Sequence, residues 1–244
     1  MSIVNPTDSD IPVPQNPAAL KRDTGKARDQ PLKLSKIGST ILAGMEPIIL
    51  ASSSPRRQEF FRLLGLPFTS VPAMIDESPR QGLNFRQIAE DLAVRKTMSV
   101  AERTGNGQGG IPAADWVLGA DTIVIFEGSI FGKPEDRDAA KGMLGRLSGR
   151  RHEVITAMAL YCVRNGKTDC RSVSSEVEFA PLSPAEIEWY LDTGEWEGAA
   201  GAYRLQELGG CLVKSINGSP SAVAGLPLHD LYVMLRDNGY RYGA

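Results

Sequence analysis

Cysteine and histidine are scarce in this chain of 244 residues, which contains three of the former and two of the latter. Cys162, Cys170 and Cys211 form no C-x-x-C pair and no ligand cluster with the histidines. This pattern argues against a disulfide framework and against a zinc site of the usual spacing. We therefore expect reduced thiols in a cytoplasmic protein.

Long apolar runs and an excess of positive charge are also missing. The longest apolar-rich segment, 116–126, is too short to span a bilayer and carries an aspartate in its middle. The N-terminus has no apolar core of the signal-peptide type. With a formal net charge of −2, the chain is expected to bind neither nucleic acid nor membrane, so any anion site must be local. A Walker A motif is absent, which argues against a P-loop enzyme.

The first 44 residues differ from the rest of the chain. They contain five of the sixteen prolines, few large apolar residues and no sustained periodicity. We interpret residues 1–44 as a flexible arm and residues 45–244 as the folded domain. Met45 stands just before the first expected strand, so it is an alternative translation start.

Within the domain, strand-like and helix-like runs alternate, but at least two strand pairs have the pattern of hairpins. Asn165-Gly166 between two β-type runs is the clearest of these signals. The sequence therefore predicts an α/β fold with a mixed sheet and flanking helices. Expected strands are 48–51, 68–72, 116–126, 130–131, 151–163, 168–179 and 211–216; expected helices are 56–64, 84–103, one containing Ala139 to Leu147, one from Ser183 to Gly194, and 227–236.

The stretch 48–57, I-I-L-A-S-S-S-P-R-R, has the pattern of a strand, a serine turn and a helix start. Pro55 suits the first position of a helix. The backbone N–H groups at such a start favour a bound anion, whereas Arg56 and Arg57 oppose the helix dipole unless an anion lies beside them. The stretch predicts either a phosphate site or an ordinary solvated arginine pair.

Asp121 and Lys133 are the next candidates. A carboxylate inside an apolar strand is costly unless it is paired, binds a metal or lies at a cleft. Asp121 is therefore a candidate for chemistry, with a strand-end residue that holds a loop as the alternative. Lys133, between Gly132 and Pro134, has a restricted backbone and suits a phosphate oxygen, although an exposed turn lysine fits equally.

Weaker candidates complete the set. Asp76 and Glu77 could supply metal oxygens or be merely solvated, and Lys96 lies off the apolar stripe of its helix. Gln206 could read a base edge, whereas His152 suits a hydrogen-bonded structural role. Together these basic and acidic residues describe a site for a metal-bound triphosphate, where positioning and charge stabilisation dominate.

Six motifs occur in the order of one known family: L-A-S-S-S-P-R-R (50–57), G-A-D-T-I-V (119–124), G-K-P-E-D (132–136), L-S-G-R-R-H-E-V-I-T (147–156), T-G-E-W-E-G-A-A-G-A-Y (193–203) and V-A-G-L-P-L (223–228). They resemble the Maf family of nucleoside triphosphate pyrophosphatases from residue 47 to about residue 238. The resemblance implies metal-dependent hydrolysis of a nucleoside triphosphate to the monophosphate and diphosphate. It also implies an inosine triphosphatase-like fold with two lobes around a central cleft.

By motif position, the resemblance gives Asp121 the role of proton acceptor. It implies that Glu77 and Asp121 bind a divalent cation, Mg²⁺ or Mn²⁺. Thr122 and Gln206 resemble the branch that cleaves dTTP and UTP, and Arg56 is the third position tied to substrate choice. The remaining phosphate and substrate contacts that the resemblance implies are Ser52, Arg57, Lys96 and Lys133.

The sequence departs from the family pattern after Gln206. Glu207 stands where the family commonly has glycine, and its side chain is expected to narrow or recharge the base pocket. Two other functions stay open: a nucleotidyltransferase, and a regulatory protein of the septum-inhibitor type that binds nucleotide without turnover. A homodimer is a further alternative for which no residue pattern argues.

Overall fold

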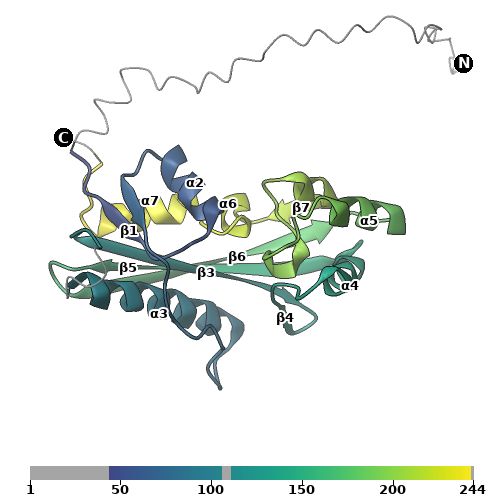
Figure 1. Ribbon diagram of the computed structural model, residues 1–244, viewed down its shortest axis with the longest axis horizontal. Coiled ribbons are helices and arrows are strands. Elements are labelled where there is room, and N and C mark those ends of the chain that lie inside the picture. The colour runs from purple at the N-terminus through teal and green to yellow at the C-terminus, as the bar shows by residue number, and fades with distance from the viewer. Residues whose placement is uncertain (1–43, 106–110, 243–244) are drawn as a thin grey trace, which may run out of the picture. The chain divides into compact units, whose positions relative to one another are not determined.

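A mixed sheet of seven strands forms the centre of the computed structural model, which describes residues 44–105 and 111–242 (Figure 1). The strand order is β2-β1-β3-β5-β6-β7, and β4 pairs with β3. The predicted arm, 1–44, lies outside the described residues apart from Gly44, as does most of the glycine-rich loop after 105. The strands are β1 Ile48–Leu50, β2 Phe68–Ser70, β3 Trp116–Phe126, β4 Ser129–Phe131, β5 Arg151–Cys162, β6 Lys167–Phe179 and β7 Val213–Asn217.

Parallel and antiparallel pairs meet at β3, which confirms the predicted mixed sheet. β1 runs parallel to both β2 and β3, whereas β4 and β5 run antiparallel to β3. β5 and β6 form the predicted hairpin around Asn165-Gly166, with Gly166 at a φ of 68°. The last strand begins at Val213 instead of residue 211, because Leu208–Leu212 form a 3-10 helix that delays it.

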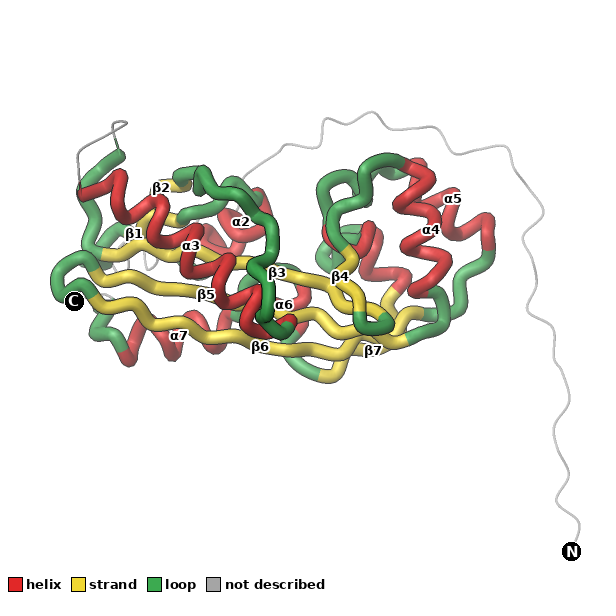
Figure 2. Tube along the Cα trace, turned by 90° about the horizontal axis from the view of Figure 1, so that it is seen from below, coloured by secondary structure: helices red, strands yellow, loops and turns green. Residues whose placement is uncertain are grey.

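Helices cover both faces of the sheet. Figures 1 and 2 show α3 along one face and α6 and α7 on the other, with α4 and α5 side by side near β4 and β7. No helix in the part of the chain that the structure describes is long and apolar enough to cross a membrane. The helices are α2 Pro55–Leu63, α3 Phe85–Gly105, α4 Arg137–Leu147, α5 Pro184–Asp192, α6 Pro220–Val223 and α7 Leu228–Asp237, with 3-10 helices η2 Ala200–Ala202 and η3 Leu208–Leu212.

Local sequence explains where several helices begin. α2 has Pro55 at its first turn, where the missing N–H costs nothing. Asp136 caps α4 by accepting from the Ala139 N–H at 2.8 Å. Ser183 and Glu186 form a reciprocal capping box at α5, so this helix starts at the Ser183 from which the sequence predicts it.

β3 passes through two hydrophobic cores. Its first half packs, through Trp116 and Leu118, into a core under α2 and α7, which we call the first core. Its second half packs, through Val124 and Phe126, into a core under α4 and α5, the second core. Asp121 and Thr122 belong to neither core and lie between Ala120 of the first core and Val124 of the second.

Residues 119–123 of β3 have an open edge. β5 pairs with β3 along this whole length. On the opposite side, β1 pairs as far as Leu118 and β4 starts pairing at Val124. Within the described residues, β3 thus has no strand neighbour on that side between 119 and 123. Because successive side chains of a strand point to opposite faces, groups from both faces of the sheet reach this gap.

Candidate functional site

A cleft of about 570 Å³ lies at the open edge of β3, and Val124, Phe131, Tyr203 and Val223 of the second core contribute to its lining. The site residues predicted from the sequence line this cleft, except Gln206 and the weaker candidate Asp76, which is exposed outside the lining. The predicted residues in the lining are Ser52, Arg56, Arg57, Glu77, Lys96, Asp121, Thr122 and Lys133. Segments far apart in the sequence therefore converge on one site.

The serine turn after β1 brings its polar groups to the start of α2. The Oγ atom of Ser52 accepts from the backbone N–H of Ser54 at 3.2 Å and from Nη1 of Arg57 at 3.2 Å. The Ser54 side chain makes no cap bond to α2. Ser52 itself is buried, so the turn holds its shape through this hydroxyl.

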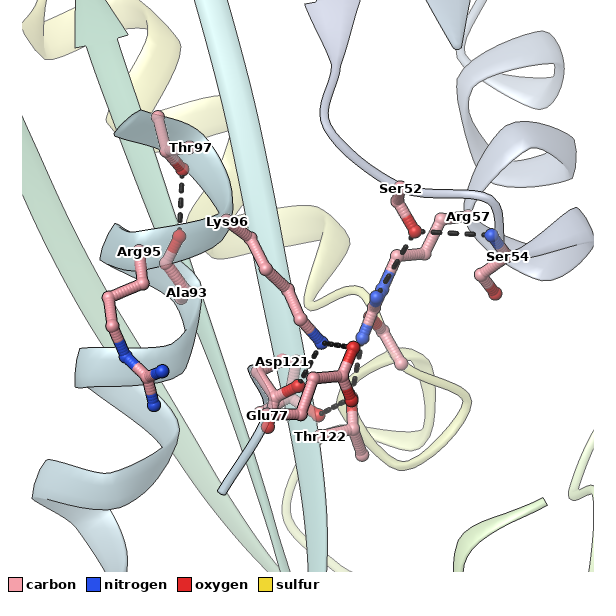
Figure 3. Close-up of polar contacts among 12 residues, drawn as sticks. Ser52, Ser54, Arg57, Glu77, Ala93, Arg95, Lys96, Thr97, Asp121 and Thr122 are labelled. Atoms are coloured by element: carbon pink, nitrogen blue, oxygen red, sulfur yellow. Dashed lines mark hydrogen bonds and ion pairs between the residues drawn. The ribbon is translucent and has the colours of Figure 1, made fainter. Parts of the chain in front are cut away.

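Arg57 joins three segments of the chain (Figure 3). Besides its bond to Ser52, its Nε donates to the Gly225 carbonyl at 2.9 Å and its Nη2 to Oγ1 of Thr122 at 3.1 Å. Burial lowers the pKa of this guanidinium, an effect that the charge of Asp121 opposes. The three bonds fix the plane of the guanidinium at the edge of β3.

Both hydrogen bonds of the Thr122 hydroxyl are made inside the protein, one to Arg57 and one to Thr156. Thr156 donates its proton to the Ala222 carbonyl at 2.7 Å and lies 2.9 Å from Oγ1 of Thr122. Because a hydroxyl has one proton, Thr122 must donate to Thr156 and accept from Arg57. Thr122 therefore orients Arg57 before any ligand binds.

Asp121 faces α3 and forms an ion pair with Lys96. The Nζ atom of Lys96 lies 2.6 Å from Oδ1 of Asp121 and 3.0 Å from Oε1 of Glu77, between the two carboxylates in Figure 3. Asp121 and Lys96 are only 7% and 8% exposed, so neither charge would be tolerated there alone. An ammonium has three N–H donors, which leaves one for a further acceptor.

Three neighbouring cations influence the pKa of Glu77. Burial would raise the pKa of Glu77, but the hydrogen bond and charge of Lys96, with smaller contributions from Lys133 and Arg57, lower it overall. Lys133 is exposed on the Gly-Lys-Pro loop after β4, where the preceding Gly132 carbonyl accepts from the Gly201 N–H at 3.1 Å. The loop is thereby tied to η2 on the second core.

The other end of the cleft contains residues that the sequence reasoning missed or placed differently. Arg204 and Tyr203 line the cleft with Arg56, and so does Glu207, whereas Gln206 is exposed outside the lining. A turn from residue 204 to residue 207 explains this, because the Glu207 N–H donates to the Arg204 carbonyl and Gln206 stands at the corner between them. No signal in the sequence fixes the corner of such a turn.

Tyr203 is positioned from behind by a buried histidine. Nε2 of His152 lies 2.8 Å from the Tyr203 hydroxyl, and both rings pack against Phe179. Burial lowers the pKa of His152 to about 4, so the ring is neutral near pH 7. His152 is thus hydrogen-bonded and behind the cleft wall, in keeping with the structural role expected from the sequence.

The carboxylates that could hold a metal are few. Within the described residues, no group of three or more histidine, cysteine, aspartate or glutamate side chains has metal-binding geometry. Glu77 and Asp121 nevertheless approach one another around Lys96. Two carboxylates suit Mg²⁺ when phosphate oxygens supply other ligands, whereas they would not form an all-protein cage.

Known proteins resemble this chain over most of its length. Residues 47–238 match the family model described as Maf-like protein. A dTTP/UTP pyrophosphatase of Symbiobacterium thermophilum is 45% identical over 196 residues, which cover 80% of this chain and 96% of the relative. A protein of the same name from Hahella chejuensis is 42% identical, covering 81% of this chain and 95% of the relative.

Solved structures are more distant. The Ham1 protein of Staphylococcus aureus has 14% identity and a TM-score of 0.39, over 55% of this chain and 72% of that one. Protein VC0702 of Vibrio cholerae has 14% identity and a TM-score of 0.28, over 62% and 72%.

Proposed function

This chain belongs to the family of Maf-like proteins, and from that premise we propose that it hydrolyses nucleoside triphosphates, dTTP and UTP above all, to the monophosphate and diphosphate. Relatives covered almost completely by the alignment carry the name dTTP/UTP pyrophosphatase. The observation that carries the proposal is the convergence of Arg57, Lys96 and Lys133 with a buried carboxylate, Asp121, in one cleft. The proposal also makes the protein cytoplasmic, because such substrates are made and used in the cytoplasm.

Asp121 is the proposed general base. Its Oδ1 is held by Lys96, whereas its Oδ2 has no hydrogen-bond partner among the described residues. Oδ2 is therefore available to accept a proton from water as the water oxygen attacks the α-phosphorus. The bond from that phosphorus to the bridging oxygen then breaks, and diphosphate leaves.

The cations are the proposed phosphate ligands. A guanidinium has five N–H donors, and Arg57 uses three of them inside the protein. Two donors of Arg57 and one of Lys96 then remain for phosphate oxygens, with Lys133 as a further point charge. Because their partners already hold them in place, these groups need little reorganisation when charge develops on the leaving diphosphate.

Glu77 and Asp121 are the proposed ligands for Mg²⁺ or Mn²⁺, as their donor chemistry allows. When bound, the cation supplies positive charge to the phosphate oxygens. Glu77 and Asp121 are already associated with one positive charge, the ammonium of Lys96. Because Lys96 contacts Oε1 of Glu77 and Oδ1 of Asp121, the cation would bind the other oxygen of each carboxylate.

Asp121→Asn is the decisive test. The amide can still accept from Lys96, so the fold should persist, but it cannot accept the proton from water. We expect diphosphate release from dTTP and UTP to fall roughly 10²- to 10⁴-fold, the usual span for loss of a general base. Lys96 then keeps only its exposed partner Glu77, so thermal unfolding should shift to lower temperature while the variant stays folded at the assay temperature. Asp138→Asn, at an exposed position on α4, serves as the matched control.

The same assay tests the other functions. Near wild-type turnover in Asp121→Asn would refute the role of this residue. A wild-type protein that binds nucleotide but releases no diphosphate would instead be a regulatory binder. Release only when an acceptor other than water is present would indicate a nucleotidyltransferase.

A further inference from the structure

The end of the cleft beyond Arg57 contains a second charged group, made of Arg56, Arg204 and Glu207. All three residues line the cleft. Nη1 of Arg204 lies 3.6 Å from Oε1 of Glu207. Both neighbours affect the pKa of Arg56. Burial lowers this pKa most, the charge of Arg204 lowers it further, and the charge of Glu207 raises it in part. The mechanism proposed above uses neither Arg204 nor Glu207.

The turn that carries Arg204 and Glu207 is held rigidly. Nη2 of Arg204 donates to the Glu197 carbonyl at 2.7 Å, and its backbone N–H to the Tyr190 hydroxyl at 3.2 Å. Behind the turn, a Cβ atom added to Gly209 would lie 2.6 Å from the Arg204 carbonyl oxygen. Only glycine permits this close packing, so the two charged side chains start from a fixed backbone.

The chemistry of this group matches one class of base. Guanidinium groups only donate hydrogen bonds, and a carboxylate only accepts them. Uracil and thymine present a carbonyl acceptor on each side of one N3–H donor. Cytosine replaces one carbonyl with an amino donor and has a bare N3 lone pair, so it opposes both a guanidinium and a carboxylate.

We propose that Glu207 accepts the N3–H of a uracil or thymine base while Arg56 and Arg204 donate to its two carbonyl oxygens. This inference rests on the proposed function, because it assigns the base-binding end of the same cleft. It replaces Gln206, which lies outside the lining, as the residue that reads the base. Glu207 and Arg204 are then specificity residues, while the chemistry of hydrolysis stays with Asp121.

Two variants of Glu207 test the inference. Glu207→Gln keeps the size of the side chain but can donate to N3 of cytosine as well as accept from N3–H. We expect the ratio of kcat/KM for UTP over CTP to fall roughly tenfold or more, since discrimination by a polar group is lost when the group can pair with either base. Glu207→Gly should lower the same ratio by removing the carboxylate.

A modified substrate tests the contact between Glu207 and N3–H independently. N3-methyluridine triphosphate lacks the N–H, so the wild-type enzyme should turn it over far more slowly than UTP. Glu207→Gly should narrow that gap, because it removes both the unpaired acceptor and the atoms that meet the methyl group. Glu102→Gln, an exposed carboxylate change on α3, is the matched control and should leave every ratio unchanged.

The outcomes are separable. Ratios within twofold of wild type in both Glu207 variants, with turnover retained, would overturn the inference and leave the proposed function intact. A loss of turnover that is equal for all nucleotides would also overturn it, because it would show a merely structural role. If the wild-type protein releases no diphosphate from any nucleotide, the proposed function fails and the inference fails with it.

Discussion

His152 stands behind the cleft wall, and its protonation state couples that wall to pH. The ring is 3% exposed, contacts the Tyr203 hydroxyl through Nε2, and leaves Nδ1 without a partner among the described residues. A second proton would place a buried charge beside the Phe179 ring. In the folded protein this histidine therefore stays neutral at pH values well below the usual pKa of histidine.

This burial predicts a loss of stability in mild acid. The pKa of His152 is lowered to about 4 in the folded protein, while in the unfolded chain it is near 6.5. Between these values the unfolded state binds the extra proton, so stability is lost as the pH falls from 6.5 towards 4. We expect a contribution of about 3 kcal/mol to the free energy of unfolding, measured by urea denaturation across this range.

The second histidine of the chain is the natural control for this pH dependence. His152→Gln should be less stable at pH 7 but should lose less stability on acidification than wild type. His229→Gln, at an exposed position on α7, should keep the wild-type slope. Equal slopes in all three proteins would show that His152 does not titrate in this way.

At the residue scale, the sequence predicts Arg56, Asp121, Lys133 and the position of Glu207 at the cleft, but it does not predict Arg204 and misplaces Gln206. Asp121 and Lys133 are unusual in their local context, one in an apolar strand and the other between glycine and proline. Arg204 has no such context, because what brings it beside Glu207 is a turn whose corner falls at Gln206. A shift of one residue in that turn would have placed Gln206 in the cleft instead.

Among the elements, β3 and α3 set the position of the ion pair. Gly119 of β3 packs directly on α3: an added Cβ would lie 2.5 Å from Oγ1 of Thr97 and 2.9 Å from the Ala93 carbonyl oxygen. Oγ1 of Thr97 lies 2.9 Å from the Ala93 carbonyl oxygen and 3.0 Å from that of Ala159, so its single proton is shared between these two acceptors. Lys96, the next residue of α3, therefore reaches Asp121 because the helix lies so close to the strand.

Gly119→Ala should push α3 away from the sheet. Because backbone atoms obstruct the new methyl group, we expect a destabilisation of about 1–3 kcal/mol, the usual cost of overpacking. Turnover should also fall, since Lys96 moves with the helix. Chemical denaturation and diphosphate release measure the two effects.

Gly142→Ala on α4 is the matched substitution. An added Cβ there meets nothing within 4 Å, and the residue has no positive φ. It should stabilise the protein by about 0.5–1 kcal/mol through helix propensity and leave turnover unchanged. If Gly119→Ala had the same stability and turnover as Gly142→Ala, the close packing of β3 on α3 would not contribute to stability or to the position of Lys96.

Element types could be predicted from the sequence more readily than their order in the sheet. The hairpin of β5 and β6 and the capping box of α5 depend on neighbours in the chain, and both are present. The placement of β1 between β2 and β3 depends on partners that are distant in sequence. The gap that β1 and β4 leave along β3, and hence the location of the cleft, has no local pattern that would reveal it.

For the whole molecule, the net charge repels a triphosphate, whereas the local charge of the cleft attracts it. The chain carries a formal charge of −2, whereas the cleft lining has a formal charge of +1, from five basic side chains and the four acidic ones Glu59, Glu77, Asp121 and Glu207; the basic ones are Arg56, Arg57, Arg204, Lys96 and Lys133. A concave site of this kind concentrates positive potential where an anion enters. Attraction of the substrate must therefore depend on the cleft alone.

Substrate capture should consequently weaken with salt. The Debye length falls from about 30 Å at 0.01 M to about 8 Å at 0.15 M ionic strength. We expect KM for dTTP to rise severalfold over this range while kcat changes little, because groups already in contact are screened less. A series in NaCl at constant pH and free Mg²⁺ measures this, and a KM that is unchanged or lower at 0.15 M would contradict it.

The bond from Arg57 to the Gly225 carbonyl spans 168 positions of the chain. Synthesis releases a protein from its N-terminus, and domains generally fold as units. The ribosome must therefore have made almost the entire domain before the Arg57 guanidinium finds its last acceptor. A nascent or prematurely terminated copy lacks this acceptor, so only a chain that extends past Gly225 can hold the Arg57 guanidinium by all three bonds.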